Sequence, residues 1–90
     1  MTDEEIIELA KAHRADCIKI GFAANAQRHA AKSLHEKQIS AVLHFIVIVT
    51  RQMEWYSKDN REELFKQATE RQSELIEKYR TLTSTNQQEN

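Results

Sequence analysis

The ninety-residue chain contains no Pro and a single Gly, Gly21. Sandwiches and barrels need many tight turns, and Gly and Pro supply much of the backbone geometry that such turns require. A chain with one Gly and 30% charged residues is therefore expected to form long helices joined by few connections. Because separate domains usually need about 100 residues each, we predict a single all-α domain over residues 1–82.

The first predicted helix covers about residues 3–20. Thr2 and Glu5 have the spacing of a capping box, in which each side chain accepts a hydrogen bond from the other residue's backbone. Gly21 is placed to end this helix, because Gly adopts positive φ angles without steric cost. A Gly inside a helix costs only about 1 kcal/mol relative to Ala, so a helix that continues through Gly21 is the alternative.

An antiparallel helical hairpin is predicted from about residues 23–56 and 60–82. The run from Phe45 to Val49 has strand propensity, but the sequence holds no second such run to pair with it. Helical spacing gives the first arm an apolar stripe with Leu34, Leu43 and Phe45 on its shoulders, whereas Val47 falls beside polar groups. The stripe consists of His35, Ile39, Val42, Ile46, Val49, Met53 and Tyr56.

The hairpin is expected to assemble further into a helical-bundle homo-oligomer. Its apolar arc covers about half the circumference of the helix, and a chain this short buries only about 60% of its unfolded surface. A homodimer or a higher oligomer would bury the apolar surface that a single chain leaves exposed. Residues 83–90 are polar and predict a flexible C-terminal tail.

The sequence indicates a cytoplasmic protein without a membrane partner. Its longest apolar stretch runs from Ile39 to Val49, well short of the roughly 20 residues that span a bilayer. The acidic start at Asp3 and Glu4 is unlike the basic start of a signal peptide. A lone cysteine, Cys17, fits a reducing compartment.

We expect no catalytic residues, no metal and no cofactor. His13 and Cys17 stand four residues apart, but a structural zinc site needs four ligands and no second Cys or clustered His pair completes the set. One Gly cannot build the loops that hold nucleotide phosphates, and no nucleophile-elbow motif is present. His13 and His35 are expected at the edge of the core, and His29 and His44 in solvent.

Three residues of the second helix predict a surface that binds a protein. Ile48, Arg51 and Trp55 lie away from the apolar stripe, and Trp and Arg are enriched among residues that dominate interface energetics. Large apolar groups on that side would otherwise remain in water. The sequence therefore predicts a nonenzymatic interaction module, an inhibitor or regulator that binds and occludes a protein partner.

A basic segment provides the alternative function. Residues 11–37 contain six basic residues and two acidic ones. Arg28, His29 and Lys32 in this segment could bind a small nucleotide-like anion or a nucleic acid. The whole chain has a net charge of −1, whereas nonspecific DNA binding usually accompanies a basic excess. The simplest interpretation of the segment is a solvated surface that balances the acidic N-terminus.

Overall fold

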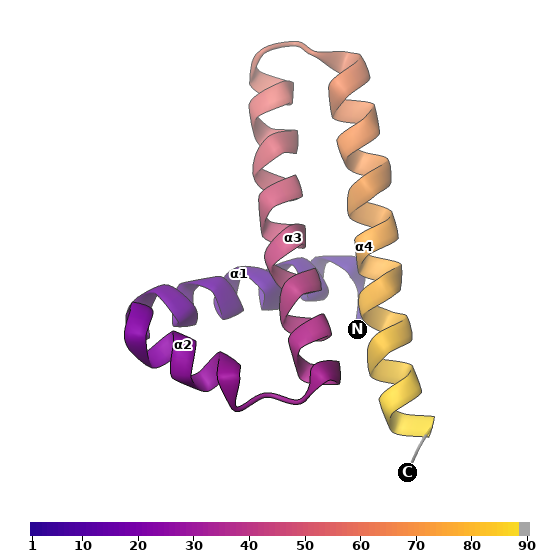
Figure 1. Cartoon of the computed structure of the whole chain (residues 1–90). Coiled ribbons are helices and arrows are strands. Elements are labelled where there is room, and N and C mark those ends of the chain that lie inside the picture. The colour runs from indigo at the N-terminus through magenta and orange to yellow at the C-terminus, as the bar shows by residue number, and fades with distance from the viewer. Residues whose placement is uncertain (89–90) are drawn as a thin grey trace.

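The computed structural model describes residues 1–88, which form four helices and no strand (Figure 1). The helices are α1 (Asp3–Ile20), α2 (Phe22–Ala30), α3 (Leu34–Lys58) and α4 (Glu62–Gln88). The predicted all-α class is confirmed. Within this range, no helix combines the length and the apolar character needed to cross a membrane.

The first helix ends at the residue that the sequence indicated. Thr2 and Glu5 form both hydrogen bonds of the capping box, at 3.2 and 2.8 Å. Gly21 has φ 89° and ψ 162°, a combination that is essentially restricted to Gly. The helix therefore stops at Ile20, and the alternative of a helix continuing through Gly21 is wrong.

The predicted continuous helix over residues 23–56 is divided in the structure. α2 ends at Ala30, and α3 begins only after Ser33, whose backbone is extended. Ser33 Oγ accepts a hydrogen bond from the Glu36 backbone, and the Glu36 carboxylate accepts one from the Ser33 backbone, both at 3.1 Å. This second capping box starts a new helix, so residues 22–30 and 34–58 are separate elements.

The two long helices α3 and α4 lie side by side and run in opposite directions (Figure 1). Between them, Asn60 adopts a positive φ of 57°, which turns the chain. α4 continues to Gln88 rather than ending at 82, so most of the predicted tail over 83–90 is helical. The last two positions of that tail, 89 and 90, lie outside the described residues.

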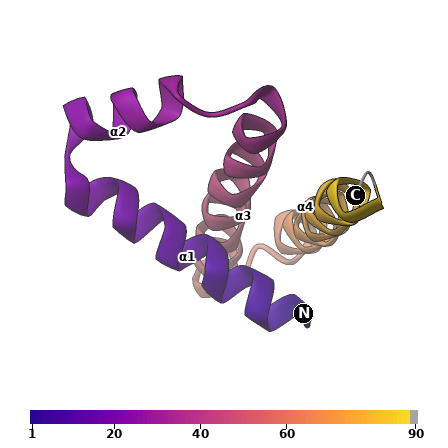
Figure 2. The ribbon, with the colours of Figure 1, turned by 90° about the horizontal axis from the view of Figure 1, so that it is seen from below.

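The core lies where α1 crosses α3 beside α4 (Figure 2). Val42 and Ile46 are buried as predicted, but Val47 is also buried, at 4% exposure, because α1 covers that side of α3. Phe45, placed on a shoulder of the stripe, is 54% exposed. The central cluster consists of Ile6, Ala10, Val42, Leu43, Ile46, Val47 and Ile76.

Candidate partner-binding surface

α3 carries a third, exposed face in addition to the two that pack in the core. Apolar side chains on this face include Leu34, Ile48 and Trp55, which are 75%, 41% and 63% exposed. Its positions follow one another in alternating steps of four and three residues, which is the spacing of a coiled-coil heptad. We call this face the α3 seam: Leu34, Gln38, Ala41, Phe45, Ile48, Gln52 and Trp55.

Contacts on the other sides of α3 fix the direction of the seam. The Ser40 hydroxyl lies 2.9 Å from Nε2 of His13 on α1, and the Thr50 hydroxyl accepts a 3.0 Å hydrogen bond from Gln72 on α4. At 100° per residue, the seam lies on the side of α3 remote from both contacts. Figure 2, which looks along α3, shows α1 and α4 on two sides of that helix. Among residues 1–88, the two packed neighbours therefore leave the seam open.

A row of basic residues flanks the seam on one side. Its members are separated by multiples of seven residues, so they keep a nearly constant position beside the seam. Arg51 and Lys58 are exposed, whereas Lys37 is partly buried. We call this set the basic row: Lys37, Arg51 and Lys58.

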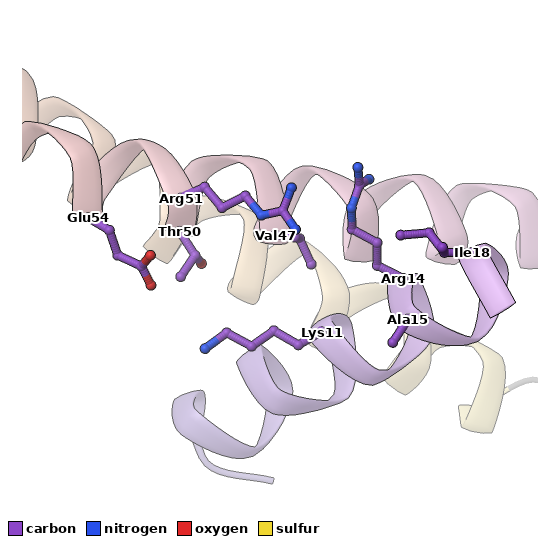
Figure 3. Close-up of a pocket in the computed structure, with 8 residues that line it drawn as sticks. All are labelled: Lys11, Arg14, Ala15, Ile18, Val47, Thr50, Arg51 and Glu54. Atoms are coloured by element: carbon purple, nitrogen blue, oxygen red, sulfur yellow. The ribbon is translucent and has the colours of Figure 1, made fainter.

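A groove between α1 and α3 continues this positive charge (Figure 3). Its volume is about 380 Å³, and its charged lining consists of Lys11 and Arg14 from α1 and of Arg51 and Glu54 from α3. The buried Nε of Arg14 has no hydrogen-bond partner among the described residues. Three cations against one carboxylate give this groove a positive charge, which suits an acidic group of a binding partner.

The predicted partner-binding residues come together on this side of α3. Ile48 and Trp55 belong to the seam, and Arg51 belongs to both the basic row and the groove. Lys11 and Arg14 were missed as site residues. The basic excess of residues 11–37 includes both, but only the crossing of α1 over α3 shows that they share a groove with Arg51.

Two of the three residues of the alternative anion site already contact other side chains of the same chain. The Arg28 guanidinium makes a 2.6 Å ion pair with Asp16, so an acidic side chain of the same chain already occupies it. Lys32 Nζ donates to Ser40 Oγ at 3.4 Å, while His29 is exposed at the end of α2. The three residues remain near one another in sequence, but two of them are engaged with separate partners.

Three metal-ligating side chains meet between α1 and α3. The side chains of His13, Cys17 and His44 place one ligand atom each within 4.8 Å of one another. Cys17 Sγ lies 3.8 Å from His13 Nε2, and the two imidazole rings make an edge-to-face contact with centroids 5.1 Å apart. His44 is half-buried, so its predicted place in solvent is wrong. No sequence pattern links it to His13, because the contact depends on the helix crossing.

Burial lowers the pKa of both His13 and His44, and nearby cations lower them further. For His13 the additional charges are His44 and Lys32, and for His44 they are Arg14 and Lys32. Both imidazoles are therefore neutral at pH 7 in the folded chain, and each resists protonation more than it would in the unfolded chain.

We expect the domain to lose stability as the pH falls from 7 towards about 5. In this range the unfolded chain binds more protons than the folded chain at His13 and His44, whose unfolded pKa is about 6.5. The free energy of unfolding therefore becomes smaller as the pH falls. Thermal melts of metal-free protein would measure the effect. A His13→Gln, His44→Gln variant should show a weaker dependence, whereas His29→Gln should retain it. A melting temperature constant over this range would contradict the expectation.

Comparison with known proteins adds no functional information. A scan against family models and searches of curated proteins and solved structures gave no match to this chain. The function is therefore inferred from the surface chemistry of the fold.

Proposed function

We propose that the chain is a nonenzymatic interaction module that binds an amphipathic helix of a protein partner on the α3 seam. It would act as an inhibitor or regulator by occluding that helix. The observation that carries the proposal is the heptad spacing of the exposed seam on α3, whose positions are apolar except for Gln38 and Gln52, because alternating steps of four and three match the packing of a second helix. The seam extends over about 32 Å, the length of a six-turn helix.

The charges beside the seam favour an acidic partner. An antiparallel second copy would bring Lys37 near Lys58, which is an unfavourable pair of basic residues. A parallel second copy would need Val42 and Val49 on the opposite flank, and both are buried in the core of their own chain. A partner helix with Asp or Glu along one edge would instead pair with the basic row.

We also propose that the free protein forms the homo-oligomer expected from its sequence, through the same apolar seam. Repulsion between basic rows would weaken this assembly, and added salt would screen the repulsion and strengthen it. Docking of an acidic helix would respond to salt in the opposite direction. Light scattering at micromolar concentration over a range of salt would test self-association, and a stable monomer under all conditions would contradict it.

Two synthetic helices test the docking proposal directly. Both would carry Leu at heptad positions, and one would carry Glu and the other Lys at the flanking positions. We expect the Glu helix to bind more tightly, by at least about tenfold, with an affinity that falls as salt is added. Fluorescence anisotropy would measure both peptides. Equal affinities, or no binding of the Glu peptide, would contradict the acidic-partner proposal.

Variants of the protein locate the binding face. An Arg51→Ala, Trp55→Ala variant should weaken binding of the Glu peptide strongly, since each such residue contributes roughly 2 kcal/mol at an interface centre. Phe22→Ala provides the matched control, because Phe22 is exposed on α2, away from the seam. Unchanged binding by the double variant would remove this face from consideration.

Native mass spectrometry of the complex from host cells would identify the natural partner, which we expect to be a cytoplasmic protein.

An Arg28→Glu, Lys32→Glu variant distinguishes the anion-binding alternative from the seam proposal. If the chain binds a nucleotide-like anion or nucleic acid through these residues, this variant should lose binding of that ligand while keeping its helical circular dichroism. The seam proposal predicts that the same variant still binds the Glu peptide. Loss of partner capture with this variant alone would favour the alternative.

A further inference from the structure

We propose that His13, Cys17 and His44 form a binding site for a single Cu⁺ ion that links α1 to α3. The set combines one thiol and two imidazoles, which are ligands that soft ions such as Cu⁺ prefer. Their ligand atoms already lie within 4.8 Å of one another. The proposal does not rest on the α3 seam, which contains none of the three ligands.

The measured separation between two of the ligand atoms fits coordination to one metal. A metal bonded to sulfur at about 2.3 Å and to nitrogen at about 2.0–2.1 Å, with an angle of 110–120° between the bonds, holds these atoms roughly 3.5–3.8 Å apart. Cys17 Sγ and His13 Nε2 are 3.8 Å apart. Metal binding at His13 Nε2 would replace its present hydrogen bond with Ser40, 2.9 Å away.

Helix geometry explains why three ligands converge here. His13 and Cys17 are four residues apart on α1, so they share one face of that helix. His44 is four residues from Ser40 on α3, and the contact between Ser40 and His13 brings that face of α3 against α1. A pocket of about 220 Å³, lined in part by His13, Ser40 and Lys32, adjoins the cluster at His13.

The charges around the cluster select a monovalent ion. Arg14 and Lys32 act on His44, while Asp16, the acidic group that acts on His13, is paired with Arg28. A Cu⁺ ion with one thiolate and two neutral imidazoles has no net charge, whereas Zn²⁺ with the same ligands leaves a charge of +1 among these cations. Zinc would also need a fourth ligand, and the cluster supplies three.

Binding of one Cu⁺ ion releases one proton. The Cys17 thiol loses its proton to the buffer as the sulfur–copper bond forms, and the two imidazoles bind in the neutral form. No electron is transferred, because the ion is supplied as Cu⁺. Affinity should therefore rise with pH, and the melting temperature should rise when the ion is added, since it binds only the folded arrangement of α1 and α3.

An anaerobic titration of Cu⁺ against the chelator bicinchoninate, with the full chain, tests the proposal. We expect one ion per chain, a loss of affinity of at least about 100-fold in Cys17→Ser and of at least about tenfold in His44→Gln, and no change in His29→Gln. Copper X-ray absorption should show one sulfur and two nitrogen neighbours. Circular dichroism of each variant would establish that it folds.

Several results would overturn the proposal. One is an unchanged affinity in His44→Gln, and another is a ratio of one ion to two chains, which would indicate copper shared between cysteines of different copies. Displacement of Cu⁺ by an equal concentration of Zn²⁺ would show that the charge argument is wrong.

Discussion

Replacing Ile46 with Asp is expected to unfold the domain. Ile46 is 0% exposed and belongs to the cluster in which α1, α3 and α4 meet. An unpaired carboxylate there would cost several kcal/mol, comparable with the total stability of a small domain, which is about 5 kcal/mol. Circular dichroism should show loss of helix at 25 °C.

The neighbouring residue supplies the matched control for this substitution. Phe45 lies one position earlier on α3 and is exposed on the seam, so Phe45→Asp should retain the helical spectrum while weakening binding of the Glu peptide. A wild-type spectrum and melting point for Ile46→Asp would show that α3 faces the core differently.

Truncation of Ile6 to Ala is expected to destabilise the whole domain by about 2–5 kcal/mol. Ile6 is almost fully buried and joins α1 to the cluster around Ile46 and Ile76. Denaturant unfolding should show a lower midpoint with a single cooperative transition. Ile18→Ala, on an exposed position of the same helix, should shift the midpoint much less. An effect of Ile6→Ala as small as that of Ile18→Ala would show that packing of α1 adds little to the stability of α3 and α4.

Helical periodicity predicted in part which residues of α3 face the core. Steps of 100° placed Val42, Ile46 and Val49 on one stripe, and all three are buried. The same calculation could not place Val47 or Phe45, because the burial of each depends on the side from which α1 approaches. Apolar periodicity defines a face of one helix, whereas the crossing of two helices depends on how both surfaces fit.

The break between α2 and α3 was missed although a local signal for it exists. The Ala-rich sequence before Ser33 favours helix, which indicated one long element. Ser33 and Glu36 have the same spacing as Thr2 and Glu5 at the start of the chain, and both pairs form capping boxes. A cap inside an apparently continuous helical pattern is therefore evidence for a new helix start.

In the candidate site too, residues of one helix could be grouped from the sequence, whereas contacts between helices could not. Ile48, Arg51 and Trp55 could be grouped from the sequence because they lie on one helix. Lys11 and His44 could not be assigned to sites, because each acquires its neighbours only through the contact between α1 and α3.

The short helix α2 has a consequence for how much change the chain tolerates. None of its nine residues is buried, and it lies between the backbone turns at Gly21 and Ser33. In the folding of the core, residues 21–33 therefore act as a loop that closes the contact between α1 and α3. The entropy of loop closure depends weakly on length, so doubling this segment would cost only about 0.6 kcal/mol. α2 is thus the position at which an inserted sequence or a fused domain would disturb neither the core nor the seam.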